Sequence, residues 1–436
     1  MSTETTRQPE KKLTKEHIKT LGLSSLGGTL EFYDFVIFVF FTSTLGPLFF
    51  PSDNEFLQQI NTLGVFAAGY LARPVGGIIM AHFGDTIGRK KMFTLSIFLM
   101  AFPTLMIGVL PTYEQIGVFA PILLVLMRIL QGAAIGGEMP GAWVFIAEHT
   151  PKHRYGFGIG TLTSGITGGI LLGSLISIAI QRTYTKEEID EFAWRIPFIL
   201  GGAFGFISVY LRRYLEETPV FKSLQAEKKV AQSLPIKTVF SQHLLACGIT
   251  AIMTWTLSTA IVVIILMTPN SILGSVHKID KTLSIEANAL ATLMLSIGCI
   301  FWGVVSDVIG TTKTALIGFI GLIISSYVFY SGLHASIGAS TLMFNYCILG
   351  FFVGIIVLTP IISTRAFPPE IRFSGLSSAY NLAYGVFGGV TPVFTIWLLS
   401  KTELAAVWYI SWVSLLAISI SFIPLAYKGY KHQQQN

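Results

Sequence analysis

The sequence GDTIGRKK at residues 84–91 recurs in altered form as SDVIGTTK at residues 306–313. Each copy lies between two apolar runs, where a short polar loop between two helices is expected. A second set of positions repeats 218 residues later, so that Gly132, Gly136, Pro151 and Arg154 correspond to Gly350, Gly354, Pro369 and Arg372. Two halves built from one structural unit are therefore predicted.

Apolar residues dominate the chain around these loops. Of 436 residues, 52% are hydrophobic and only 12% are charged, which excludes an ordinary soluble domain. About twelve runs approach the roughly 20 apolar residues that a helix needs to cross a bilayer. The runs lie at residues 21–50, 58–81, 92–111, 117–147, 155–181, 194–214, 243–268, 287–305, 314–334, 339–364, 373–400 and 404–427. We predict an all-α membrane protein with twelve transmembrane helices in two six-helix bundles.

The polar segments divide the chain into five parts. The longest polar interruption, residues 216–242, mixes both charge signs and is predicted to be a cytoplasmic linker. It separates a first bundle at residues 21–215 from a second at residues 243–428. Residues 1–20 and 429–436 are predicted to be short cytoplasmic tails.

The charges outside the apolar runs predict the orientation of the chain. Basic residues gather in alternate loops, such as Lys90, Lys91, Arg212 and Arg213, and are sparse in the loops between. Because basic loops stay on the cytoplasmic side, both termini are expected there. The net charge of +6 then belongs to the inner membrane face. No basic stripe is interleaved with aromatic residues, so we expect no nucleic-acid partner.

Further motifs occur in a fixed order along the whole chain: EFYDF at 31–35, RPVGG at 73–77, RILQG at 128–132, WRIPF at 194–198, EETP at 216–219, PEIR at 369–372 and GGVTP at 388–392. Together with GDTIGRKK, this order resembles the metabolite:proton symporter family of the major facilitator superfamily. The resemblance implies two bundles related by a pseudo-two-fold axis, with a substrate site between them. It also implies a monomer in the bacterial inner membrane that imports a small polar metabolite, such as proline, a betaine, shikimate or citrate, together with protons.

Two departures from the family pattern affect what can be carried over. Thr311 and Thr312 stand where the family commonly has basic residues, which predicts a weak or absent latch in the second half. The seventh span carries Thr254, Trp255 and Thr256 where relatives tend to show tyrosines. The substrate of any one relative therefore does not transfer directly to this chain.

Glu31 and Asp34 lie one helical turn apart inside the first apolar run. A charge in the bilayer core is costly, and an ionisable residue there indicates function. We expect both acids to face a central cavity, with Arg128 of the fourth span as their partner. An acid paired with arginine stays ionised, and without the pair it takes up a proton. Sugar-type members of the superfamily have a similar acid and arginine, so the resemblance implies proton coupling by Glu31, Asp34 and Arg128. A fixed ion pair that only orients two helices is the alternative.

The expected substrate cavity is lined by polar and aromatic residues of both halves: Tyr33, Gln131, Glu138, Trp255, Asn345, Tyr380, Asn381 and Tyr384. Glu138 either relays protons or lines the cavity. Arg73 is interpreted as a packing residue whose side chain extends to the membrane interface. One interior arginine then faces up to three interior acids, so a zwitterion or monocarboxylate is the favoured guest, although an organic carboxylate stays open.

A cytoplasmic gate is expected where the polar loops meet: Asp85, Gly88, Arg89, Glu148, Arg154, Asp307 and Arg372. Asp85 is predicted to cap the helix that follows it, and Arg89 to reach acids on a neighbouring helix.

Several protein classes are disfavoured by the motifs. The chain has no phosphate-binding loop, no nucleophile elbow and no zinc-protease signature, so ATP-driven transport and catalysis are not expected. The eight histidines form no ligand cluster, so we expect no metal or other cofactor and the proton gradient as the energy source. A proton-driven exporter of a drug-like compound or siderophore remains an alternative, since fold alone does not fix direction.

Overall fold

The computed structural model describes residues 14–52, 55–226, 235–334 and 336–423. All regular structure in these ranges is helical. The helices of the first half are α1 (Lys15–Phe40), α2 (Thr42–Phe49), α3 (Glu55–Ile87), α4 (Arg89–Val109), α5 (Tyr113–Ile116), α6 (Phe119–His149), η1 (Lys152–Arg154), α7 (Tyr155–Thr183), α8 (Lys186–Glu188), η2 (Ile189–Ala193) and α9 (Arg195–Arg212).

Two short helices follow, α10 (Pro219–Ala226) and α11 (Pro235–Gln242), within the predicted linker. The second half consists of α12 (Leu244–Thr259), η3 (Ala260–Val276), α13 (Lys281–Ile309), α14 (Thr311–Ser331), α15 (Ala339–Val353), η4 (Gly354–Val357), α16 (Leu358–Ala366), η5 (Pro369–Ile371), α17 (Arg372–Leu399) and α18 (Ala405–Ser421).

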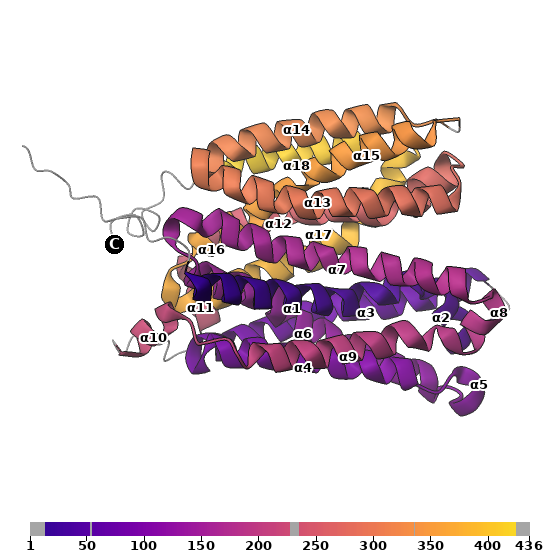
Figure 1. Cartoon of the computed structure of the whole chain (residues 1–436), viewed down its shortest axis with the longest axis horizontal. Coiled ribbons are helices and arrows are strands. Elements are labelled where there is room, and N and C mark those ends of the chain that lie inside the picture. Colours follow the sequence, from indigo (N-terminus) through magenta and orange to yellow (C-terminus); the bar gives the residue numbers. More distant parts are fainter. Residues whose placement is uncertain (1–13, 53–54, 227–234, 335, 424–436) are drawn as a thin grey trace, which may run out of the picture.

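The long helices run side by side along the long axis of the molecule, and each half forms its own bundle (Figure 1). Each of the twelve predicted spans contains helix, as an apolar run in lipid must satisfy its backbone hydrogen bonds internally. Within the described ranges, nine helices are long and apolar enough to cross a membrane by themselves, or ten if the bent pair of Lys186–Ala193 and Arg195–Leu211 counts as one span. The α10 and α11 helices lie at one end of the molecule, which we call the linker end.

Three spans are interrupted. The first breaks at Phe41, between α1 and α2. The seventh widens into the π-helix η3, which contains Pro269 and extends to Val276, beyond the predicted limit of residue 268. Proline has no backbone N–H to donate, so regular α-helical winding is difficult around it. The tenth span contains the 3₁₀ turn η4 between α15 and α16.

Glycines bring α3 and α6 into backbone contact. A Cβ atom on Gly132 would lie 1.8 Å from the carbonyl oxygen of Gly69, and one on Gly136 would lie 2.1 Å from that of Arg73. The second half repeats this crossing, because a Cβ atom on Gly350 would lie 2.2 Å from the carbonyl oxygen of Ala291 on α13. The repeated glycines of the sequence therefore permit the same close crossing in both halves.

The two halves meet along two helix pairs. Helix α7 of the first half packs along α13 of the second, and α3 packs along α17. In the first pair, a Cβ atom on Gly156 would lie 2.2 Å from the carbonyl oxygen of Gly303. Side chains of α3, α7, α13 and α17 therefore lie where they can act across the interface.

Candidate functional site

Asp34 is a buried acid on α1 that faces α9. It is 1% exposed. A Cβ atom on Gly201 would lie 2.6 Å from its Oδ1 atom, and one on Gly205 would lie 3.2 Å from its Oδ2 atom. Neither oxygen accepts a hydrogen bond from the described residues. The glycines of α9 therefore make the space that this carboxyl group fills.

Two side chains, those of Thr104 and Gln131, lie between Asp34 and Arg128 on α6. The Arg128 Nη1 atom donates to Gln131 Oε1 at 2.9 Å, and Gln131 Nε2 donates to Thr104 Oγ1 at 2.6 Å. The methyl group of Thr104 and the carboxyl group of Asp34 both come within 3 Å of the place that a Cβ atom on Gly201 would take. Thr104 therefore lies next to Asp34. The direct contact between Asp34 and Arg128 that the sequence predicted is wrong for this conformation.

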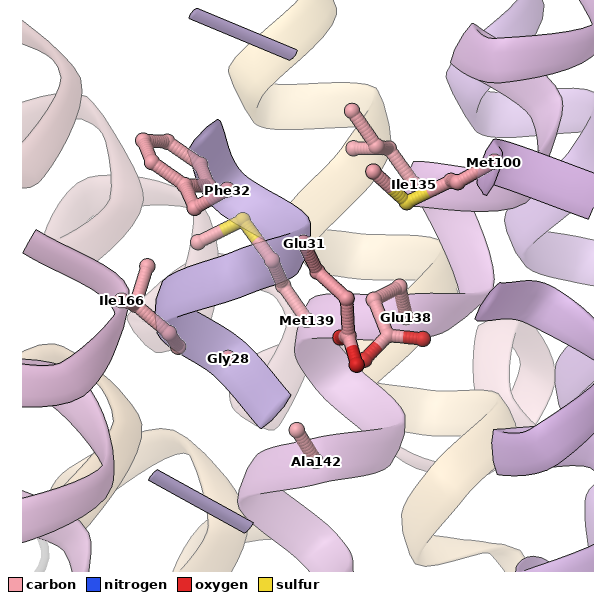
Figure 2. A pocket seen from close by; sticks show the side chains of 9 residues that line it. All are labelled: Gly28, Glu31, Phe32, Met100, Ile135, Glu138, Met139, Ala142 and Ile166. Carbon is pink, nitrogen blue, oxygen red and sulfur yellow. The ribbon is translucent and has the colours of Figure 1, made fainter. Parts of the chain in front are cut away.

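Glu31 has different neighbours from Asp34, although the two lie one turn apart. Figure 2 shows the carboxyl groups of Glu31 and Glu138 pointing toward each other. They share a pocket whose other lining residues are Gly28, Phe32, Met100, Ile135, Met139, Ala142 and Ile166. Ser96 Oγ donates to Glu138 Oε2 at 2.5 Å. Glu31 and Asp34 thus differ in their described neighbours, and their facing one common cavity stays a prediction.

Arg73 on α3 is the functional candidate that sequence reasoning misplaced. It is 1% exposed, so the expectation that its side chain reaches the membrane interface is wrong. Its guanidinium carbon lies 4.4 Å from the ring centre of Tyr384, 5.5 Å from that of Tyr70 and 5.9 Å from that of Tyr380. We call these three rings the tyrosine cage. Two of them belong to α17, in the other half of the molecule.

The polar contacts of Arg73 are weak. Its Nη2 atom lies 3.9 Å from Met139 Sδ, and its Nε atom has no hydrogen-bond partner among the described residues. Met139 also accepts a contact from the Tyr380 hydroxyl at 3.8 Å and lines the pocket of Glu31 and Glu138. Met139 therefore separates that pocket from the tyrosine cage.

Other predicted cavity residues have partners elsewhere. The Tyr33 hydroxyl donates to the Pro197 carbonyl oxygen at 2.9 Å, inside the first half. Trp255 Nε1 donates to the Tyr409 hydroxyl at 2.8 Å, inside the second half. Asn345 on α15 is partly exposed. A place for these three residues in one substrate cavity stays a prediction.

Asn381 joins the halves. It is 0% exposed, and its Nδ2 atom donates to the Gly136 carbonyl oxygen at 2.6 Å. Ser377, one turn earlier, donates to the carbonyl oxygens of Gly77 and Gly136 at 3.0 and 3.1 Å. Helix α17 is thus hydrogen-bonded to the α3–α6 crossing, and Ser377 is a residue that sequence reasoning missed.

At the linker end, two aspartates each cap a helix of the opposite half. Asp85 Oδ2 accepts from the backbone N of Ser374 at 2.8 Å, in the first turn of α17. Asp307 accepts from the backbone N atoms of Gly156 and Phe157 at 2.6 and 2.8 Å, in the first turn of α7. The carboxylates also suit the positive ends of these helices. The expectation of a weak or absent second latch is therefore wrong, because its bonds need the aspartate and not the basic residues.

The helix that follows Asp85, α4, has Gly88 at its N-cap without a side-chain cap. The sequence predicted that Asp85 would cap α4, the helix that follows it. The cap that is observed is on α17, in the other half. Gly88 has a φ of +132°, which favours glycine. Glu217, a residue missed by the sequence analysis, accepts from Lys90 N at 3.2 Å.

An ion pair lies beside these caps. Arg372 Nη1 lies 3.2 Å from Glu148 Oε1, with side-chain exposures of 10% and 0%, so the pair joins α17 to α6. The side chain of Arg154 is exposed at the same end, and the side chain of Arg89 lies outside the described part of the chain. The structure thus brings together Asp85, Glu148, Asp307 and Arg372 from the predicted gate.

A comparison with known families identifies the fold. The model of the Major Facilitator Superfamily matches residues 32–280. The chain belongs to the major facilitator superfamily. It is thus a multi-pass membrane protein of a superfamily of transporters, and the expectation that it is not an enzyme agrees with this membership.

Individual relatives and solved structures agree with this superfamily assignment. A protein of Staphylococcus aureus (strain COL) named putative proline/betaine transporter is 35% identical over 425 residues, covering 95% of this chain and 90% of the relative. The proline/betaine transporter of Salmonella typhimurium is 31% identical, covering 88% and 78%. The MFS proton:xylose symporter XylE, bound to 6-bromo-6-deoxy-D-glucose, matches with a TM-score of 0.78 at 14% identity, covering 94% of this chain and 96% of the other. The last match shows the superfamily fold alone.

Proposed function

We propose that this chain imports a small polar metabolite together with protons across the bacterial inner membrane. A zwitterion such as proline or a betaine is the favoured substrate, in keeping with the names of the curated relatives. An organic carboxylate is the broader alternative within the same transport class. The basic loops predict cytoplasmic termini, so the linker end is taken as the cytoplasmic side.

The observation that carries proton coupling is the environment of Asp34. This carboxyl group is buried, lies within the membrane-spanning part of α1, and accepts no hydrogen bond from the described residues. Thr104 and Gln131 connect its surroundings to Arg128. A small shift of α4 or α6 would let Arg128 approach the acid, and pairing with arginine favours the ionised form. Asp34 can therefore release its proton in one conformation and bind it in another.

The gate gives the other half of the mechanism. The caps made by Asp85 and Asp307, together with the ion pair of Glu148 and Arg372, hold the linker end shut. Alternating access requires these contacts to break when the opposite end closes. Protonation of Asp34 and binding of substrate would then set which end is open. Each shifts the equilibrium only by as much as its affinity differs between the two conformations.

Transport by reconstituted protein tests the proposal. Proteoliposomes with an imposed inward proton gradient should accumulate labelled proline or glycine betaine. Asp34→Asn should abolish accumulation and spare counterflow, because exchange of substrate needs no net proton movement. The exposed Glu191→Gln variant on η2 is the matched control and should behave as the wild type. Accumulation by Asp34→Asn at wild-type level would contradict the proposal, and gradient-driven uptake into inside-out vesicles would favour the exporter instead.

A further inference from the structure

Arg73 is a buried cation whose counter-ion is not found among the described residues. No carboxylate of these residues lies within ion-pair distance of it, and its nearest polar neighbours are the Met139 sulfur and the tyrosine cage. The free energy gained when a guanidinium stacks on aromatic faces is smaller than the desolvation penalty of a buried charge. The rings alone therefore do not account for an arginine at this depth, and an anion that is absent between transport cycles does.

We propose that Arg73 binds the carboxylate of the transported substrate and that the tyrosine cage holds its cationic group. The inference rests on the proposed function and names its substrate contacts. The guanidinium fork matches a carboxylate with two parallel hydrogen bonds. When a carboxylate draws the guanidinium away from the rings, the ring faces are left for an ammonium or quaternary ammonium group. The resting Arg73 thus occupies the place that the substrate cation takes.

The surroundings of Arg73 allow a small molecule to approach. Met139, an unbranched and adaptable side chain, lies between Arg73 and the pocket of Glu31 and Glu138. A change of its rotamer would join that pocket to the tyrosine cage. Tyr70 is partly exposed, and a Cβ atom on Gly388 would already touch the rings of Tyr384 and Tyr70 at 3.2 and 3.9 Å. Glycine at this position therefore keeps the ring faces uncovered.

The position of the cage couples binding to movement of the halves. Arg73 and Tyr70 belong to α3, whereas Tyr380 and Tyr384 belong to α17. The stacked pair of Tyr70 and Tyr384, with ring centres 5.9 Å apart, lies directly at the interface. A substrate that replaces the contact between Arg73 and the α17 rings changes how the halves are joined at that point. This placement also assigns the two buried arginines different tasks, with Arg128 serving the proton and Arg73 the substrate.

A comparison of acid and amide ligands tests the assignment. Binding of proline and prolinamide, and of glycine betaine and its carboxamide, is measured by calorimetry on the full-length protein in nanodiscs. Each pair differs only at the carboxylate. Arg73→Gln should weaken binding of the acids about 10- to 100-fold and should not weaken binding of the amides, which have no carboxylate for the guanidinium to bind. Tyr384→Leu should weaken binding of the acids roughly fivefold and binding of the amides less, because only a carboxylate draws the guanidinium off the ring that would hold the cation. Arg73→Lys, which keeps the charge without the fork, should give an intermediate loss.

The control is Arg213→Gln. Arg213 is exposed at the linker end and stacks on Tyr210 and Tyr214 at 3.6 and 4.9 Å, so this variant removes an arginine–tyrosine stack outside the proposed site. It should bind all four ligands as the wild type does. Equal loss of acid and amide binding in Arg73→Gln, or no loss of either, would overturn the role of Arg73 and leave the proposed function standing. A wild type that binds neither zwitterion would overturn both. If Arg73→Gln does not fold, Arg73→Lys decides, since its loss of acid binding must again exceed its loss of amide binding.

Discussion

Arg128 and Arg73 are both fully buried arginines of the first half, yet their neighbours differ in kind. Arg128 donates to Gln131 of its own helix and lies 4.2 Å from the ring centre of Phe38, also in the first half. Arg73 lies among rings that come mainly from the second half. An arginine whose described contacts all lie in its own bundle can keep them while the halves move. An arginine whose contacts lie in the other half loses them. With the roles proposed for Arg128 and Arg73, the proton site would move with one half and the substrate site would be assembled by two.

The largest effect should come from the crossing that carries both arginines. Gly132→Ala would place a Cβ atom 1.8 Å from the Gly69 carbonyl oxygen, so α3 and α6 must separate. Such overpacking costs about 1–3 kcal/mol or more, and we expect both substrate binding and accumulation to be lost. Gly64→Ala on α3, where a Cβ atom meets nothing within 4 Å, should be close to neutral. Thermal unfolding and transport assays check both variants, and a functional Gly132→Ala protein would show that the crossing does not hold the two sites.

Arg128→Gln should separate the two tasks. Removing the charged donor to Gln131 costs about 1.5–3 kcal/mol, so proton-driven accumulation should fall about 10- to 100-fold. Affinity for the zwitterion should stay within about twofold, since Arg73 is untouched. Counterflow and calorimetry distinguish the two quantities. Equal losses of affinity and accumulation would remove the distinction between the arginines.

Thr104→Val should give a smaller loss of the same kind. The substitution leaves Gln131 Nε2 without its acceptor, which costs about 1–2 kcal/mol, or roughly 5- to 30-fold in accumulation. Thr94→Val on the same helix removes a hydroxyl that bonds only its own helix at the Lys90 carbonyl oxygen and is the matched control. If both variants behave alike, Thr104 does not connect Asp34 with Arg128.

The smallest effect is expected at the gate, where each half supplies one aspartate that caps a helix of the other half. Asp307→Ala and Asp85→Ala each remove a helix cap worth about 1 kcal/mol, so the fraction of molecules open at the linker end should rise about fivefold in each. Double electron–electron resonance between labels on Lys91 and Lys313, both exposed, measures this fraction. A change in only one variant would show that the caps, like the arginines, are unequal.

The fold followed from the sequence because apolar runs of membrane length leave few alternatives to helix. The repeated glycines predicted two related halves, and the structure adds that they permit close helix crossings. The site was harder to predict, since Glu31 and Asp34 are close in sequence but point to different neighbours around the helix. Thr104 carries no unusual pattern, and two of the three rings around Arg73 come from α17, some 300 residues away. Contacts of this kind are set by packing between halves, for which the chain alone gives no signal.

The gate caps have an evolutionary consequence. In both, the donors are backbone N–H groups of Gly156, Phe157 and Ser374, which every residue except proline supplies. The side chains of Phe157 and Ser374 can therefore change without loss of the caps, whereas Gly156 is constrained by its close approach to Gly303 and each aspartate by its role as acceptor. Correlated substitutions, which reveal many contacts between side chains, should therefore be missing between Asp307 and Phe157 and between Asp85 and Ser374, although these pairs join the two halves.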